Sequence, residues 1–264
     1  MHSHIIWHER VIVMNAPVFC TAGQSDALSY AADILKQKGC SVVQQPDKTV
    51  SHLLLPVPSF DADGTLKGGG DLASALERVP RNVTIIGGNF GTFSPAGYRC
   101  VDLLQDPFYL AENADITAHC AVKLLLAKLP CTLRRCPVLV IGWGRIGKCL
   151  ADLFRRMGAA VTVAVRKPTD RAMLEALGYE SLNTNALSYE LVRFRVIVNT
   201  VPAMVLSREK ISYCRPGCLL MDLASVPGID ADNVIWARGI PNRDAPESSG
   251  ELIARTVLRK GGSL

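Results

Sequence analysis

Short apolar runs alternate with amphipathic segments along most of the chain, as expected for strands that alternate with helices in a parallel sheet. In the first part of the chain, apolar runs predict strands at 16–23, 40–45, 51–59 and 82–90. Apolar residues spaced three and four apart predict helices at 25–39 and 72–79 between them. Ser25 is the expected N-cap of the first helix, and Gly39 is its expected stop.

The middle of the chain predicts a change from one lobe to another. A helix at 98–104 and a strand at 108–111 are expected to complete the first lobe. A long helix is then expected to begin at Asp115 or Thr117 and to end before Pro130, because proline cannot continue it. We interpret this helix as a bridge between two lobes.

The remainder of the chain has a more regular pattern. Apolar runs predict strands at 138–141, 160–165, 196–201, 218–224 and 234–238. Helices are expected between these strands. A final helix is expected to begin at Ser248, because Glu251 lies three residues further on and completes a capping box. This helix is expected to run to Lys260 and to be stopped by Gly261.

One segment at 138–167, VLVIGWGRIGKCLADLFRRMGAAVTVAVRK, carries the spacing G-x-G-x-x-G between a predicted strand and a predicted helix. In such a turn the first glycine permits the tight bend and the second lets the backbone approach a pyrophosphate. The third lets the helix pack on the strand. The helix presents free N–H groups to phosphate at its start. A glycine-rich turn can be purely structural, but this context favours a dinucleotide site made of Gly142, Trp143, Gly144, Arg145, Ile146 and Gly147.

The end of the next predicted strand bears on which dinucleotide would bind. A carboxylate at this place bonds the ribose 2′-hydroxyl of NAD. Here the chain has Arg166 and Lys167 instead, and a guanidinium suits a phosphate. The sequence therefore favours NADP. NAD stays open as the alternative, because Asp170 lies three residues beyond Lys167.

Polar residues end two of the later predicted strands, where ligands bind in open α/β sheets. The segment VIVNTVPAM and the segment LLMDLAS both place such residues at a carboxyl end. Each one could instead cap the next turn, but two adjacent strands favour a functional role. The expected additional cofactor contacts are Asn199, Thr200, Val201, Pro202, Asp222, Ala224 and Ser225.

These patterns together predict an α/β fold with two Rossmann-like lobes, mostly parallel sheets with helices on both faces, and a cleft between the lobes. The expected divisions are a leader at 1–14, an N-terminal α/β substrate lobe at 15–114, a bridging helix at 115–130, a Rossmann dinucleotide-binding domain at 131–247 and a C-terminal helix at 248–264.

Composition adds few constraints. The 264 residues are 48% hydrophobic and 20% charged, which is a globular composition, and the net charge of +5 mildly favours an anionic ligand. The basic residues are scattered, so no nucleic-acid stripe is expected. No apolar run reaches the roughly 20 residues that span a membrane. The start does not have the pattern of a signal peptide, so a cytoplasmic location is expected.

Cysteine and histidine usage gives no clear metal site. The nine cysteines include no C-x-x-C pair, which indicates reduced thiols and argues against zinc. Three of the five histidines lie in the first 14 residues; a metal site there stays open, but the simpler interpretation is a leader. No histidine follows His119, and no tyrosine precedes a lysine by four residues. Two common dehydrogenase mechanisms therefore lack their acid–base residue.

The glycine segment, the segment VIVNTVPAMVL and the segment LLMDLASVPGID resemble, in this order and spacing, the A subunit family of dipicolinate synthase. HLLLPVPS, AENADITAHCAV and ARGIPNRDAPESSGELIARTVL are similar to further segments of that family. The resemblance implies an NADP- or NAD-dependent oxidoreductase of two α/β lobes. It would oxidise a dihydro- or hydroxytetrahydro-dipicolinate to dipicolinate for bacterial spores, and its partner would be a flavoprotein-like B subunit.

The chain departs from the family pattern where the substrate is expected. His119 stands where the family has glutamate, Ile116 where it has proline, and the family's Leu-Pro-Gly becomes Ile240-Pro241-Asn242. His119 is the candidate catalytic acid–base group, because it could face the cleft and move a proton, but it could equally be a packed or surface histidine. The expected substrate contacts are Gly88, Asn89 and Thr117, with Thr117 holding a carboxylate at a helix start.

Two alternatives therefore stay open beside the family reaction. A related dehydrogenase could act on another small dicarboxylate or on an imino acid. A non-catalytic subunit could bind NADP without turnover. A homo-oligomer is compatible with each of these functions. The family reaction and the related dehydrogenase activity would both require a small anionic substrate.

Overall fold

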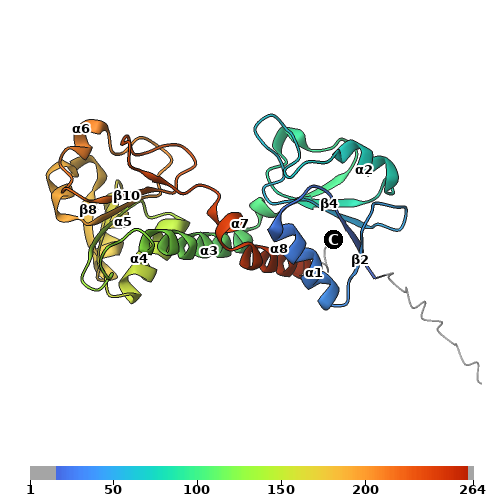
Figure 1. The fold of residues 1–264 in the computed structure, drawn as a ribbon, viewed down its shortest axis with the longest axis horizontal. Helices are drawn as coiled ribbons and strands as arrows, with labels where there is room; N and C mark the ends of the chain where they lie inside the picture. Colours follow the sequence, from blue (N-terminus) through green and yellow to red (C-terminus); the bar gives the residue numbers. More distant parts are fainter. Residues whose placement is uncertain (1–15, 261–264) are drawn as a thin grey trace, which may run out of the picture.

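The computed structural model describes residues 16–260 of the chain. The leader expected at 1–14, with its histidines, and the stop expected at Gly261 lie outside these residues. Figure 1 shows two α/β lobes at opposite ends of one long helix, α3. Each lobe contains one parallel sheet, of five strands in the first lobe and six in the second. The predicted fold class is confirmed.

The first sheet has the strand order β2-β1-β3-β4-β5, and all its strand pairs are parallel. Its strands are β1 (Val18–Thr21), β2 (Ser41–Val43), β3 (His52–Leu54), β4 (Thr84–Gly87) and β5 (Arg99–Asp102). Helix α1 (Asp26–Gln37) begins where predicted, because the hydroxyl of Ser25 accepts a hydrogen bond from the N–H of Leu28 over 3.1 Å. Helix α2 (Leu72–Arg78) packs over the other face with Val79 and Val83.

The second sheet has the order β11-β10-β9-β6-β7-β8, again with parallel pairs throughout. Its strands are β6 (Pro137–Ile141), β7 (Ala160–Val165), β8 (Glu180–Asn183), β9 (Val196–Asn199), β10 (Leu219–Asp222) and β11 (Ile235–Trp236). Counted along the chain from β6, this is the order 3-2-1-4-5-6 of the doubly wound dinucleotide fold. The chain reverses direction across the sheet between β6 and β9.

Alternate residues of β6 point into two different cores, which explains its continuous apolar run. Val138 and Val140 pack against α3 and α4, whereas Leu139 and Ile141 face the opposite core with Phe194 and Leu206. The helices of this lobe are α4 (Arg145–Arg156), α5 (Pro168–Ala176) and α6 (Arg208–Ile211). Short 3₁₀ turns across the molecule are η1 (Gly91–Phe93), η2 (Leu103–Gln105), η3 (Thr184–Ala186) and η4 (Ser188–Arg193).

Helix α3 (Pro107–Leu126) connects the lobes, and its predicted start at Asp115 or Thr117 is wrong. The carboxylate of Asp106 accepts hydrogen bonds from the N–H groups of Phe108 (3.0 Å) and Tyr109 (2.9 Å), which caps the helix eight or more residues earlier. Pro107 follows at the first helical position, where its missing N–H costs nothing. The predicted strand at 108–111 is therefore also wrong, because those residues form the first turn of α3.

The predicted helix at 98–104 is wrong as well, because β5 occupies most of it. Cys100 and Val101 of β5 pack into the cores on opposite faces of the first sheet, so pairing with β4 overrides the helical spacing. Strand β8 was not predicted at all. It lies at the edge of the second sheet, and Glu180 and Ser181 give it no apolar alternation.

The last helix returns to the first lobe. Helix α8 (Pro246–Lys260) follows the short helix α7 (Ile240–Asp244), and Figure 1 shows it beside α1. Leu252 and Val257 of α8 share a core with Leu28 and Leu35 of α1. The predicted start at Ser248 is wrong by two residues, because Pro246 takes the first helical position. Within residues 16–260, no helix is long and apolar enough to cross a membrane.

Candidate functional site

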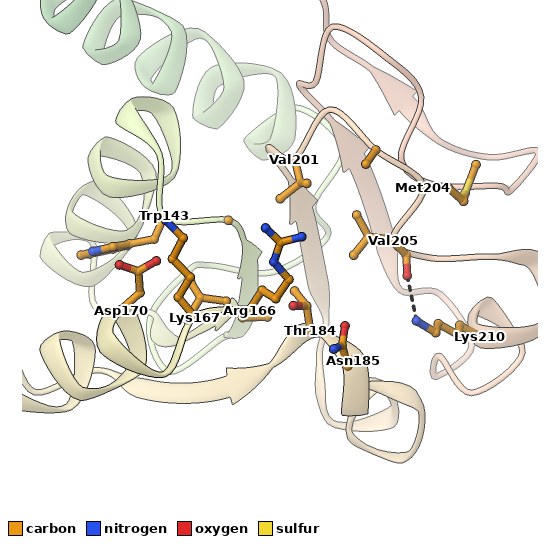
Figure 2. Close-up of a pocket in the computed structure, with 14 residues that line it drawn as sticks. Trp143, Arg166, Lys167, Asp170, Thr184, Asn185, Val201, Met204, Val205 and Lys210 are labelled. Carbon is orange, nitrogen blue, oxygen red and sulfur yellow. Dashed lines mark hydrogen bonds between the residues drawn. The ribbon is translucent and has the colours of Figure 1, made fainter.

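The carboxyl ends of β6, β7 and β9 surround a pocket of about 360 Å³ in the second lobe. It lies where the strand order reverses, which is where open α/β sheets bind ligands. Figure 2 shows the side chains that line it. They are Gly142, Trp143, Ala164, Val165, Arg166, Lys167, Asp170, Thr184, Asn185, Val201, Ala203, Met204, Val205 and Lys210.

Two glycines of the predicted turn are required by packing. Gly142 has a φ of 106°, and a Cβ there would lie 2.4 Å from the hydroxyl oxygen of Thr200. A Cβ on Gly147 would lie 2.2 Å from the carbonyl oxygen of Gly142. The Thr200 hydroxyl donates to the carbonyl of Ile141 over 2.9 Å, so it cannot easily move away. These two glycines therefore allow β6, α4 and the loop after β9 to meet.

Gly144 differs from its two neighbours in the motif. A Cβ at Gly144 would meet no atom of the described residues within 4 Å, and its φ of −77° suits any residue. The fold therefore does not require glycine at this position. Gly144 is the N-cap of α4 and has no side chain to cap it, so the first N–H groups of the helix face open space. This open backbone is what a pyrophosphate needs in order to approach.

Basic side chains dominate the charge of the pocket. Arg166 and Lys167 follow β7 directly, and neither side chain has a hydrogen bond or ion pair to another residue in the range 16–260. Figure 2 shows the guanidinium of Arg166 directed into the pocket towards Val201. Lys210 lies across from it and donates a hydrogen bond to the carbonyl of Val205 over 3.1 Å. Asp170 is the one carboxylate among the lining residues.

The pocket contains residues that sequence reasoning missed. Thr184 and Asn185 follow β8, and predicting that strand would have placed them at the same edge as Arg166. Met204, Val205 and Lys210 come from the segment after β9. No sequence signal marked Lys210, because its place depends on how that segment folds back over the sheet.

Several residues predicted to contact the cofactor instead hold two loops together. Asn199 and Asp222, both fully buried, end the adjacent strands β9 and β10. Nδ2 of Asn199 donates to Oδ1 of Asp222 over 3.0 Å, and Oδ1 of Asn199 accepts from the N–H of Val201 over 3.0 Å. The Asp222 carboxylate also accepts from the N–H groups of Ala224 (3.0 Å) and Gly228 (2.7 Å). This network fixes the loops on one side of the pocket.

Of the predicted cofactor contacts, five line the pocket: Gly142, Trp143, Arg166, Lys167 and Val201. The others do not line it: Gly144, Arg145, Ile146, Gly147, Asn199, Thr200, Pro202, Asp222, Ala224 and Ser225. Gly144 and Arg145 nevertheless lie at the N-terminus of α4, next to the pocket residue Trp143. Asn199, Thr200 and Asp222 shape the pocket through their hydrogen bonds rather than by reaching into it.

The two predicted substrate-site residues on α3 lie elsewhere. His119 is the thirteenth residue of the helix, is 63% exposed, and lies 3.9 Å from the Asp115 carboxylate. Thr117 is in the helix interior, and its buried hydroxyl donates to the carbonyl of Asn113 over 2.6 Å. The expectation that Thr117 offers free helix N–H groups to a carboxylate is wrong, because α3 begins ten residues earlier, at Pro107. Neither residue lines the pocket.

Gly88 and Asn89 lie in the first lobe, directly after β4. Oδ1 of Asn89 accepts hydrogen bonds from the N–H groups of Ser59 (2.8 Å) and Phe60 (3.1 Å), and Nδ2 donates to the carbonyl of Phe60. Its amide is thus occupied in holding the loop after β3. The Gly88 N–H donates to the Ser59 hydroxyl over 2.9 Å. In the described part of the chain, no cluster of His, Cys, Asp and Glu could hold a metal ion.

The second sheet, its reversal point and the open glycine turn define a dinucleotide-binding type of Rossmann fold. No protein-family model matches the chain. The A subunit of dipicolinate synthase from Bacillus subtilis (strain 168) is 24% identical over 239 residues, which is 83% of this chain and 80% of the relative. The resemblance seen in the sequence is confirmed.

Solved structures agree on the fold. The crystal structure of the dipicolinate synthase A subunit from Bacillus halodurans superposes with a TM-score of 0.79 at 20% identity, covering 92% of this chain and 97% of that chain. A transhydrogenase from Sinorhizobium meliloti superposes with a TM-score of 0.70 at 15% identity, covering 93% of each. The fold and the relative together support an oxidoreductase-like protein.

Proposed function

We propose that the chain is an NADP-dependent oxidoreductase. The observation that carries the proposal is the free space at Gly144, directly before the N-terminus of α4. Gly142 and Gly147 are explained by packing, whereas no close contact requires glycine at 144, and the open space there would let a ligand approach the backbone. A diphosphate fits this place because helix N–H groups and the helix dipole favour negative charge.

Arg166 supports NADP over NAD. It extends from the end of β7 into the pocket with no partner among residues 16–260, and Lys167 lies beside it in the chain. Two cations suit the dianionic 2′-phosphate, whereas NAD would offer them only hydroxyl groups. Asp170 could accept hydrogen bonds from those hydroxyls, so NAD binding is expected to be weaker rather than absent.

The bound cofactor would supply a nicotinamide ring that accepts or donates hydride. The chain's own residues would bind and orient it: the α4 N-terminus at the diphosphate, Arg166 and Lys167 at the ribose phosphate, and Val201 against the rest of the molecule. The network of Asn199 and Asp222 would keep the loops after β9 and β10 in place while the cofactor enters.

For the substrate, we propose a dihydro- or hydroxytetrahydro-dipicolinate that is oxidised to dipicolinate. The support is the similarity to the A subunit of dipicolinate synthase over 83% of this chain. A second, flavoprotein-like subunit would then be its partner. Gly88, Asn89 and His119 stay predictions as substrate-site residues, whereas the predicted role of Thr117 at a helix start is wrong, and none of the four lines the pocket.

A related dehydrogenase acting on another dicarboxylate or an imino acid is the second candidate. The observation that favours it is Asn242, which stands where the family pattern has glycine. Its Nδ2 donates to the carbonyl of Val57 over 2.9 Å, and this joins α7 to a loop of the first lobe. A contact that the family pattern lacks, between segments expected to surround a substrate, favours a changed specificity. A non-catalytic NADP-binding subunit predicts the same cofactor binding without turnover.

The test is a calorimetric titration of the purified chain with NADP and, separately, with NAD. We expect NADP to bind more tightly, and we expect Arg166→Gln to weaken NADP about tenfold while changing NAD little. Arg78→Gln is the matched control, because Arg78 is exposed at the end of α2 in the first lobe. Equal affinities in the wild type would contradict the NADP assignment, and binding of neither would contradict the proposed function.

Turnover separates the substrate candidates. A panel of dihydrodipicolinate, other cyclic and linear dicarboxylates and imino acids would be incubated with NADP, and reduction would be read at the nicotinamide absorbance band. Activity with dihydrodipicolinate alone supports the first candidate, and activity with another acid supports the second. Tight NADP binding without turnover, even with the partner subunit present, would favour the non-catalytic subunit.

A further inference from the structure

A second pocket lies at the amino-terminal ends of the strands of the second sheet, where β6, β9 and β10 begin. It has a volume of about 310 Å³. It does not share a residue with the pocket at the glycine turn, which we call the dinucleotide pocket. Three separate segments of the chain contribute to it. The residues that line it are Cys131, Thr132, Arg134, Arg135, Cys136, Pro137, Arg195 and Arg215.

Four arginines line this pocket, and no carboxylate does. None of the four side chains makes a hydrogen bond or an ion pair with another residue between 16 and 260. Elsewhere in the same lobe, by contrast, Arg193 binds Glu180 and Glu190, and Arg208 binds Asp230 and Asp232. Four guanidinium groups without a counter-charge repel one another, and an anion bound among them would offset that repulsion.

The side chain of Arg195 provides a separate observation. Its Nε atom is buried and has no hydrogen-bond acceptor among the described residues. A buried N–H group on a charged side chain is costly to leave unpaired. The backbone of Arg195 cannot move away, because its N–H donates to the carbonyl of Pro137 and its carbonyl accepts from Leu219, each over 2.9 Å. The backbone of Arg195 is thus fixed between β6 and β10, and its side chain has a buried donor that remains unused.

The arginines from different segments act on the same space. Burial raises the pKa of the Cys136 thiol, and the neighbouring Cys131 raises it further, whereas the charges of Arg195 and Arg215 both lower it. The same two arginines lower the pKa of Cys218, which its neighbour Cys214 and burial raise. Two side chains that come from the starts of β9 and β10 therefore direct their charge at one region beside Cys136.

We propose that this arginine pocket binds a small phosphate-bearing anion, separately from the dinucleotide. A phosphate monoester carries close to two negative charges and three acceptor oxygens, whereas a carboxylate carries one charge and two oxygens. Guanidinium forks match phosphate oxygens in pairs. The lining contains no aromatic ring, and its only apolar residues are Pro137 and the two cysteines, so recognition falls on the anionic group. The hydroxyl of Thr132 is a further donor.

The test is calorimetric titration, in a phosphate-free buffer, with inorganic phosphate and separately with glucose 6-phosphate. Arg195→Gln and Arg215→Gln are the test variants. Arg166→Gln removes the main cation of the dinucleotide pocket, and Arg78→Gln is an exposed control in the first lobe. We expect both anions or one of them to bind the wild type, about tenfold weaker binding in each test variant, and a change below twofold in Arg78→Gln; Arg166→Gln reports any phosphate that binds in the dinucleotide pocket instead.

The outcomes separate this site from the dinucleotide site. Binding of glucose 6-phosphate but not inorganic phosphate identifies a phosphate ester as the ligand, and the reverse identifies free phosphate. The proposal is overturned if neither anion binds at millimolar concentration, or if binding is lost in Arg166→Gln and retained in Arg195→Gln. Circular dichroism checks that each variant is folded, and if Arg195→Gln is not, Arg215→Gln and Arg134→Gln decide.

Discussion

Asn199 and Asp222 hold each other across the ends of two adjacent strands, with Nδ2 of Asn199 donating to Oδ1 of Asp222 over 3.0 Å. Both side chains are fully buried, and every other hydrogen bond of the two side chains goes to the loops after β9 and β10. Their positions in the sequence are those of ligand-binding residues. The structure gives them a different task, which is to fix the loops that border the dinucleotide pocket.

Replacing Asp222 should therefore lower the stability of the fold, because its side chain holds loops together and does not line the pocket. In Asp222→Asn one acceptor oxygen becomes an NH₂ group that faces the N–H of Gly228 or the amide of Asn199. We expect a loss of about 3 kcal/mol in the free energy of unfolding, because buried donors then oppose each other. Urea unfolding followed by tryptophan fluorescence measures it, since Trp143 and Trp236 both lie in the second lobe.

The matched control is Asp26→Asn, an exposed aspartate in the first turn of α1. It should cost about 0.5 kcal/mol or less, because surface carboxylates near a helix start contribute little. An Asp222→Asn protein as stable as the control would show that the network does not support the loops.

The cap at the start of α3 predicts how the stability of the fold depends on pH in the acidic range. Burial raises the pKa of Asp106, but the N–H of Tyr109 and the charges of Lys260 and Arg259 outweigh it and hold the pKa at about 2. The folded pKa is below the value of about 3.9 in an unfolded chain. The carboxylate therefore stabilises the fold fully above about pH 4, and this contribution is lost as the pH falls through about 2.

Asp106→Asn isolates this effect, because asparagine still caps a helix but carries no charge. We expect the variant to be less stable by about 2 kcal/mol at pH 7 and equal to the wild type only below about pH 2. Urea midpoints at several pH values would show the two curves converging. Asp61→Asn, whose exposed partner Lys67 is 3.8 Å away, should show no such convergence. A constant difference at all pH values would contradict the ion pairs of Asp106 with α8.

Turnover measurements can decide whether His119 takes part in catalysis. If it moves a proton during the reaction, His119→Gln should lower kcat by about 10²-fold or more. NADP affinity should stay the same, because His119 does not line the dinucleotide pocket. An unchanged kcat would leave His119 as an exposed partner of Asp115 on α3. Asp115→Asn, assayed in parallel, reports the effect of losing that pair alone.

Much of the fold could be predicted from the sequence because local signals and tertiary packing agree there. Strand β6 reads as an apolar run since both its faces are covered, and α1 starts at Ser25 because its hydroxyl caps the helix. The glycine turn was predicted for the same reason. Gly142 and Gly147 are fixed by close contacts that only glycine allows. Packing therefore requires glycines at this spacing, and the spacing is visible in the sequence.

The rest depended on tertiary contacts that leave no local pattern. The apolar run after Pro107 looked like a strand, although an aspartate followed by a proline is also a signal for a helix start, and α3 begins there. Edge strand β8 has half-exposed polar residues, so Thr184 and Asn185 were missed with it. Lys210 reaches the pocket only through the folding of its loop, and the arginine pocket draws on three segments far apart in sequence.

The central claim is that a dinucleotide binds at the glycine turn, and Gly144→Ala tests it most directly. The variant should unfold within about 1 kcal/mol of the wild type, because its Cβ meets no atom of the described residues within 4 Å and the loss is limited to the poorer N-cap that alanine makes. Its NADP affinity, measured by calorimetry, should fall at least about tenfold, because the Cβ occupies the space that the diphosphate needs. An equally stable variant that binds NADP as tightly as the wild type would contradict the account.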